Sequence, residues 1–86
     1  MNVNTLYQAN VNGFVLVRLA ATPEQRRVAA EGMVDGEIVA SGSAADNTLE
    51  SVISSPKQTF TFRVLKGSKW EVDSDEITGV EVRWVK

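Results

Sequence analysis

Four carboxylates gather within a short stretch near the end of the chain, and they are the first candidates for chemistry: Glu71, Asp73, Asp75 and Glu76. Paired carboxylates can act as general acid and base, and carboxylate oxygens are the ligands that calcium prefers. The stretch has the composition of a turn, however, where carboxylates are solvated and cap the backbone. It also lacks the central glycine and the closing glutamate of an EF-hand calcium loop. We therefore interpret it as a solvated turn, and Asp35-Gly36-Glu37 as a hairpin turn, because Asp-Gly favours one.

The chain contains no histidine and no cysteine, the residues that most often serve as general base, nucleophile or metal ligand. Ser41-Gly42-Ser43 lacks the Gly-x-Ser-x-Gly pattern of a nucleophilic serine, and no imidazole exists to activate it. The six glycines are scattered singly and form no phosphate-binding loop. We therefore predict that the protein is not an enzyme and takes no cofactor and no metal. The alternative is a carboxylate- or tyrosine-based activity through Tyr7 or residues 73–76.

Aromatic and basic residues occur together in the last third of the chain: Phe60, Phe62, Trp70, Trp84, Lys66, Lys69 and Arg83. On a β-sheet, aromatic rings flanked by cations can stack the bases of single-stranded nucleic acid. Plain packing explains the phenylalanines, whereas each tryptophan is either a lid on the core or an anchor in an interface. The candidate binding residues are Trp70, Trp84, Lys69 and Arg83. A net charge of −2 and a pI of about 5.0 make nucleic acid the less favoured partner, because phosphate binding usually requires a basic excess.

An exposed sheet edge offers a second route to a partner. Residues 3–11 carry no charge, and an uncharged edge strand leaves its backbone groups open to pairing with another chain. We therefore predict a non-catalytic protein-interaction module that acts through an exposed sheet edge and a terminal aromatic surface. A strand-exchanged or edge-to-edge homodimer is one form of this prediction. A small β domain that binds single-stranded nucleic acid is the alternative.

The length of 86 residues indicates one domain, residues 1–86, whose core must be small. Without disulfides or a structural metal, this core rests on apolar packing alone. No stretch approaches the roughly 18 apolar residues that span a bilayer, and the first residues lack the segments of a signal peptide. We therefore expect a cytoplasmic protein without a membrane partner.

In the first half of the chain, turn signals predict hairpins. Asn12-Gly13 favours a type I′ turn between strands over residues 6–11 and 14–20, the second of them central in a sheet and covered on both faces. Two alternatives exist for the next segment. Thr22-Pro23 could begin a helix that ends at Gly32, or residues 27–33 could form a strand that pairs with residues 38–41 across Asp35-Gly36. The second alternative is slightly favoured.

In the second half, a capping Asp46 precedes apolar residues at helical spacing, Leu49, Val52 and Ile53, which predicts a short helix that packs on the sheet before Pro56. Residues 58–65 then alternate, with Phe60, Phe62 and Val64 inward. Residues 70–72 and 80–85 follow as strands, with Val80, Val82 and Trp84 on one side, and short turns between them predict an antiparallel meander.

These elements predict an α+β fold, in which a curved antiparallel sheet of about five or six strands carries one or two helices on one face. A small half-open barrel is the variant. This layout is similar to that of many small phage- and plasmid-borne bacterial proteins, a likeness of size and shape that implies no activity.

Overall fold

Alternating apolar and polar residues produce strands along most of this chain. The computed structural model describes residues 1–22, 27–45, 57–75 and 78–86. Seven strands lie in these ranges, and none of the described residues is helical: β1 (Tyr7–Gln8), β2 (Gly13–Ala20), β3 (Arg27–Val34), β4 (Glu37–Ala45), β5 (Lys57–Val64), β6 (Lys69–Asp73) and β7 (Val80–Val85). No helix long and apolar enough to cross a membrane occurs in these ranges.

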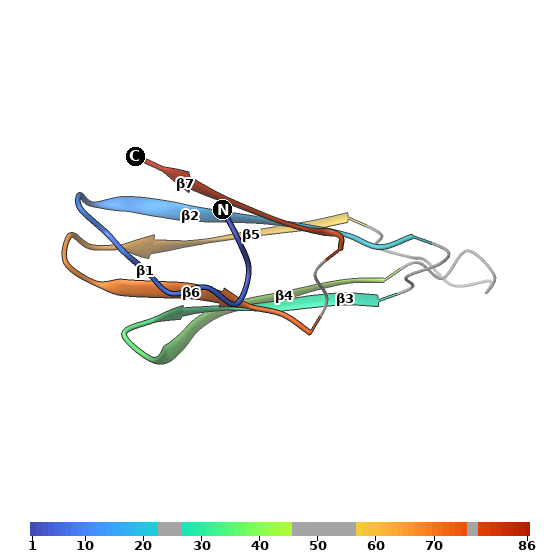
Figure 1. Cartoon of the computed structure of the whole chain (residues 1–86). Coiled ribbons are helices and arrows are strands. Elements are labelled where there is room, and N and C mark those ends of the chain that lie inside the picture. The colour runs from blue at the N-terminus through green and yellow to red at the C-terminus, as the bar shows by residue number, and fades with distance from the viewer. Residues whose placement is uncertain (23–26, 46–56, 76–77) are drawn as a thin grey trace.

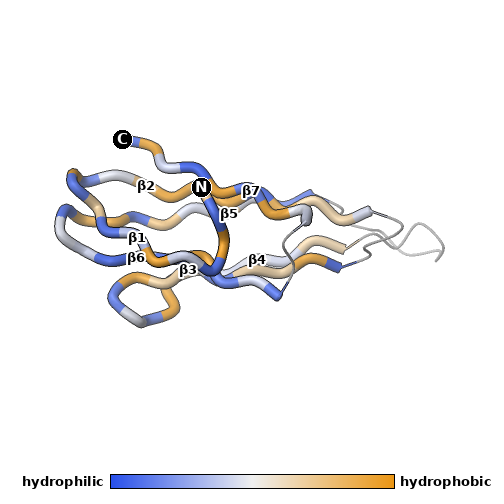
Figure 2. Tube along the Cα trace, in the orientation of Figure 1, coloured by the Kyte–Doolittle hydropathy of each residue, from blue (hydrophilic) through white to orange (hydrophobic). Residues whose placement is uncertain are grey.

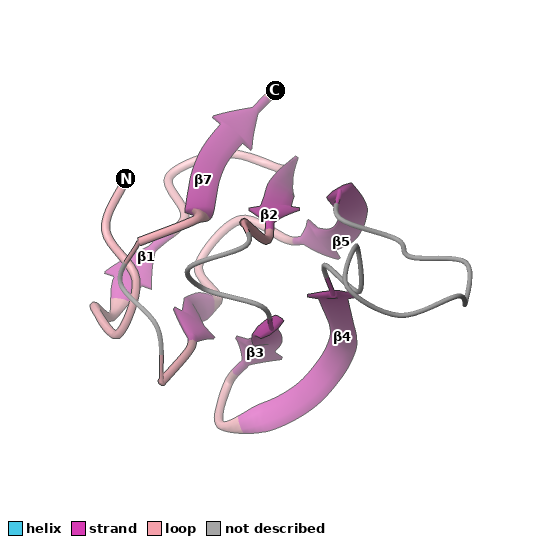
Figure 3. Ribbon diagram, turned by 90° about the vertical axis from the view of Figure 1, so that its right-hand side faces the viewer, coloured by secondary structure: helices cyan, strands magenta, loops and turns pink. Residues whose placement is uncertain are grey.

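The strands form two antiparallel sheets that pack face to face (Figure 1). The four-stranded sheet has the order β1-β6-β3-β4, and the three-stranded sheet has the order β5-β2-β7. Seen along the strands, the sheets are two layers, and β4 curves toward β5 at one side (Figure 3). Each sheet therefore has one face toward the core and one face toward solvent.

The core lies between the two layers. In β2, Val15, Val17 and Leu19 are at most 1% exposed, whereas the residues between them point outward. Val28 and Val72 of the other sheet meet them and are fully buried. Figure 2, coloured by hydropathy, shows apolar and polar residues alternating within single strands. The branched side chains favour extended backbone and fill the space between the sheets.

One close approach between the sheets requires glycine. A Cβ atom on Gly32 of β3 would lie 2.3 Å from Cε1 of Phe62, so the phenylalanine ring of β5 occupies the space that any larger residue would need. Phe62 is 6% exposed. The ring of Phe62 in one sheet therefore packs directly against the backbone of Gly32 in the other.

The predicted α+β class is wrong, because the described residues form an all-β sandwich. The predicted helix over residues 46–53 lies outside the described residues. For residues 27–33, the strand alternative is confirmed: β3 pairs with β4 on one side and β6 on the other. Alanine and glutamate favour helices, but Val28, Ala30 and Gly32 alternate inward, and pairing on both sides overrides that preference. The turn at Asp35-Gly36 is confirmed, with φ angles of 51° and 83°.

The predicted hairpin at Asn12-Gly13 is wrong. β1 pairs with β6 of the four-stranded sheet, whereas β2 pairs with β5 and β7 of the other. Neither Asn12 nor Gly13 has a positive φ. Instead, Oδ1 of Asn12 accepts a hydrogen bond from the backbone N of Lys66, 2.7 Å away, and Gly13 already belongs to β2 opposite Val64. The chain therefore crosses from one sheet to the other at this point.

The predicted single curved sheet and its C-terminal meander are also wrong. β5 and β7 flank β2, while β6 lies between β1 and β3 in the other sheet. The predicted inward sets are confirmed, since Phe60, Phe62 and Val64 face the core, as do Val80, Val82 and Trp84. Alternation shows which side of the sheet a residue faces, but it does not show which strand lies beside its own. β2 is central, as predicted, but only one of its faces is covered.

Candidate functional site

The predicted tryptophan surface is largely interior. Trp70 is 2% exposed, and its ring stacks with Tyr7 at a centroid distance of 4.9 Å and with Trp84 at 5.8 Å. Phe62 adds a third, T-shaped contact at a centroid distance of 6.5 Å. Trp84 is half-buried and lines an open recess with Tyr7 and Val11. Trp70 therefore presents no free ring face to a nucleobase.

The four predicted binding residues do not converge. Lys69 is exposed on the outer face of the four-stranded sheet, because its neighbour Trp70 points inward. Arg83 is exposed on the outer face of the three-stranded sheet, where its Nε lies 3.0 Å from Oε1 of Glu81. The two cations thus face opposite directions, with the tryptophans between them.

The uncharged segment over residues 3–11 does lie at a sheet edge, since β1 is a terminal strand of its sheet. Its strand is only two residues long, Tyr7–Gln8, and both residues already pair with β6. Gln8 also donates a side-chain hydrogen bond to the carbonyl of Gly67. So short a strand offers few backbone groups to a second chain, and the broad faces of the sandwich provide much more surface.

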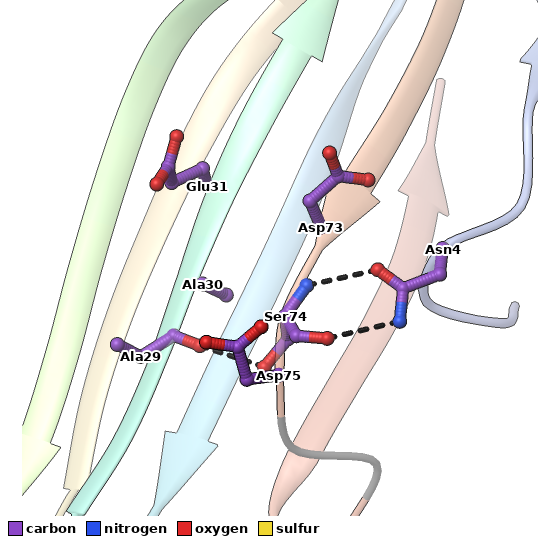
Figure 4. A pocket seen from close by; sticks show the side chains of 7 residues that line it. All are labelled: Asn4, Ala29, Ala30, Glu31, Asp73, Ser74 and Asp75. Carbon is purple, nitrogen blue, oxygen red and sulfur yellow. Dashed lines mark hydrogen bonds between the residues drawn. The ribbon is translucent and has the colours of Figure 1, made fainter.

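Two of the four predicted carboxylates, Asp73 and Asp75, line an open pocket together with Glu31 of β3 (Figure 4). Asn4 closes one side, because its Nδ2 donates to the carbonyl of Ser74 and its Oδ1 accepts from the Ser74 backbone N. Ser74 in turn donates its hydroxyl to the carbonyl of Ala29. Within the described ranges, no three carboxylates are grouped so that they could hold a metal ion. Glu76 lies outside those ranges.

The carboxylates instead give one broad face of the molecule a negative charge. Glu31 of β3 lies directly opposite Asp73 of β6, and Glu71 lies opposite Met33 on the same outer face. Burial raises the pKa of the Glu71 carboxyl, and Asp73 raises it further through its negative charge and a side-chain hydrogen bond. Like charges on neighbouring strands repel each other. We call this surface, with Glu31, Glu71, Asp73, Met33 and Ile38, the acidic face; it also carries the cations Arg27 of β3 and Lys69 of β6, so three carboxylates stand against two cations.

The opposite broad face has the opposite charge. Strand pairing places Phe14 between Arg63 and Val85, Leu16 between Thr61 and Arg83, and Arg18 between Thr59 and Glu81. Residues directly opposite each other in antiparallel strands share a face, with Cβ atoms about 5 Å apart. Lys57 extends the face beside Ala20. We call this surface the basic face; its cations are Arg18, Lys57, Arg63 and Arg83, and its carboxylate is Glu81.

Phe14 is a large exposed apolar residue of the basic face, and it lies at one end of that face. Its side chain is 48% exposed, and Val85 beside it is 43% exposed. In the part of the chain that the structure describes, Arg18, Lys57 and Arg63 make no ion pair, while Arg83 pairs with Glu81. Aromatic residues and arginine are enriched at protein interfaces, so Phe14 beside the unpaired Arg63 makes this end of the face a candidate binding surface.

The sequence predictions missed most of the basic face. The alternation over residues 58–65 places Arg63 outward, but it does not reveal that Phe14 is its neighbour. The expectation that both faces of residues 14–20 would be covered also concealed Phe14 and Arg18. The useful signal was Arg18 itself, because a charged residue within an apolar run indicates one solvated face.

No protein-family model matches this chain, and no curated protein and no solved structure shows significant similarity to it.

Proposed function

We propose that this chain is a non-catalytic interaction module that binds an acidic protein surface through its basic face. The observation that carries the proposal is the position of Phe14, half exposed between Arg63 and Val85 on a solvent-facing sheet. Aromatic residues and arginine are enriched at the centres of protein interfaces, where a buried ring supplies affinity and surrounding charges select the partner. The absence of histidine and cysteine from the sequence supports a role in binding rather than catalysis.

The size of the basic face predicts weak, reversible binding. β2 has eight residues, which at about 3.3 Å each give a length of roughly 26 Å. Three strands about 4.8 Å apart therefore present on the order of 400 Å², about half of what one partner contributes to a standard interface. Binding of this kind depends on charge and falls steeply with salt.

A poly-glutamate peptide with a fluorescent label provides the test. Its anisotropy should rise with protein concentration at about 10 mM NaCl, where the Debye length is about 30 Å, and stay flat at about 1 M NaCl, where it is about 3 Å. The double variant Lys57→Glu, Arg63→Glu should weaken binding by about tenfold or more. Both residues are exposed in β5, so this change leaves the core intact.

The matched control is Arg27→Glu, Lys69→Glu. It makes the same change in net charge, with one lysine and one arginine replaced, but on the outer face of the four-stranded sheet. This control should bind the peptide about as well as the wild type does. Equal losses in both double variants would show that only net charge matters, and would reject a specific role for the basic face.

Single-stranded nucleic acid is the second candidate partner of the same face, because an exposed ring between cations can also stack a base. The observation in its favour is again Phe14 beside Arg63. The acidic pI disfavours it, because neighbouring carboxylates repel phosphates. A labelled poly-thymidine oligonucleotide in the same titration separates the two. If the oligonucleotide binds more tightly than poly-glutamate, in a salt-sensitive way that Phe14→Ser abolishes, then the partner of the basic face is nucleic acid and not an acidic protein surface.

A further inference from the structure

We propose that the acidic surface bound by the basic face is the acidic face of a second copy of this chain, so that copies associate head to tail. This inference rests on the proposed function and names its partner. The two faces belong to different sheets and point away from each other, as the two layers in Figure 3 show. One copy can therefore use both faces at the same time.

The charges select this arrangement over a symmetric dimer. Two basic faces, each with four cations and one carboxylate, would bring Arg18, Lys57 and Arg63 against their own copies. Two acidic faces would each bring a smaller net negative charge, because Glu31, Glu71 and Asp73 share their face with the cations Arg27 and Lys69. Like charges across an interface are unfavourable, so the basic face repels its own copy, and the acidic face gains more from the basic face than from its own copy. The basic face on the acidic face is the pairing that brings opposite charges together. Such a contact joins different surfaces, and repetition gives an open chain instead of a closed dimer.

The two faces also match in spacing and in apolar content. Both are built of antiparallel strands, so their outward side chains repeat at about 4.8 Å across the strands and about 6.7 Å along them. On the acidic face, the half-buried Met33 lies opposite the exposed Ile38 and beside Glu71. This apolar pair flanked by a carboxylate is the counterpart of Phe14 and Leu16 flanked by arginines. Cations would also relieve the repulsion between Glu71 and Asp73 that raises the pKa of Glu71.

Sedimentation velocity of the full chain tests the inference. At about 10 mM NaCl and about 1 mM protein, the wild type should show a series of species above the 9.4 kDa monomer, and at about 1 M NaCl the monomer alone. The basic-face variant Lys57→Glu, Arg63→Glu and the acidic-face variant Glu31→Gln, Glu71→Gln should each be monomeric under both conditions. Circular dichroism and thermal unfolding check that both variants are folded.

An equimolar mixture of the two variants is the decisive measurement. The first variant keeps its acidic face and the second keeps its basic face, so one contact can form, and the mixture should stop at a heterodimer. A wild type that stays monomeric at low salt would overturn the inference, as would a closed homodimer or an association that survives in the basic-face variant. If poly-glutamate still binds the basic face in those cases, the proposed function stands and only the identity of its partner is wrong.

Discussion

The indole rings of Trp70 and Trp84 stack at a centroid distance of 5.8 Å with their planes 15° apart, although the two residues belong to different sheets. Trp70 lies on β6 and Trp84 on β7. Tyr7 of β1 extends the stack on the side of the four-stranded sheet. These rings therefore join the two layers near the termini, and their stacking contributes to the stability of the sandwich.

Replacement of Trp70 by alanine should lower the free energy of unfolding by about 3–5 kcal/mol, because a large buried ring leaves a cavity that the sandwich cannot close. Urea denaturation followed by circular dichroism measures the change. Trp70→Phe should lower the free energy of unfolding by clearly less, since it keeps an aromatic contact with Tyr7 and Trp84. A loss below about 1 kcal/mol for alanine would contradict the interior position of Trp70.

Gly32→Ala should destabilise the fold by about 1–3 kcal/mol, because the added methyl group meets the ring of Phe62 across the sandwich. Phe62→Leu in the same chain should recover part of this loss, since leucine leaves more space above β3. Gly36→Ala is a useful comparison. No atom lies within 4 Å of its added Cβ, so its expected cost of about 1 kcal/mol comes from the positive φ alone and should not respond to Phe62→Leu.

Glu71 should make stability depend on pH in a defined direction. Its pKa is raised in the folded state by burial and by Asp73, so the folded chain holds this proton more tightly than the unfolded chain does. The free energy of unfolding therefore falls as pH rises from the ordinary glutamate pKa, about 4.3, through the raised folded value. The penalty is absent at lower pH and complete above the raised pKa.

Glu71→Gln removes this penalty and should be more stable than the wild type at neutral pH but not at about pH 3. Urea denaturation at the two pH values measures the difference. Asp73→Asn should move the pKa of Glu71 down toward its ordinary value, which NMR titration of the side-chain carboxyl carbon detects. An unchanged Glu71 titration in Asp73→Asn would show that the two carboxylates are not coupled.

Phe14→Ser should leave stability within about 0.5 kcal/mol of the wild type, because the side chain is half exposed on the outer face. The same substitution at the neighbouring Val15, which is fully buried, should cost several times more. Phe14→Ser should nevertheless weaken poly-glutamate binding or self-association. Thermal unfolding and the binding titration on the same samples separate the two effects, and a variant that is both unstable and unable to bind would contradict a role confined to the surface.

Local features of the chain could be predicted where neighbouring residues decide them. Asp35 and Gly36 accept positive φ angles, so the hairpin between β3 and β4 follows from two adjacent residues. The inward positions of Phe62 and Val64 follow from alternation within one strand. In both cases the physical cause acts over a few residues, and the amino-acid order is sufficient to read it.

Strand neighbours depended on the whole molecule. Asn12-Gly13 resembles a hairpin turn, but the chain changes sheets there, because Asn12 bonds to Lys66 and Gly13 is packed against Trp84. The ring of Phe62 packs on Gly32, and this contact helps decide which face of β5 meets β3. Because the two residues are far apart in the sequence, no local pattern predicts the contact. Register and strand order are set by hydrogen bonds and packing between distant segments, which compete with many alternative pairings of similar strands.

The candidate surface illustrates the same division. Its outward residues Arg63 and Arg83 could be assigned to the solvent side of their strands from alternation alone. That they lie on one face with Phe14, opposite the carboxylates of β3 and β6, followed only when β2 was placed between β5 and β7. Residue order specifies how many charges a chain carries and which side of a strand each occupies, because these are local properties. The folded arrangement of the strands decides which charges meet, because that depends on contacts between segments far apart in the chain.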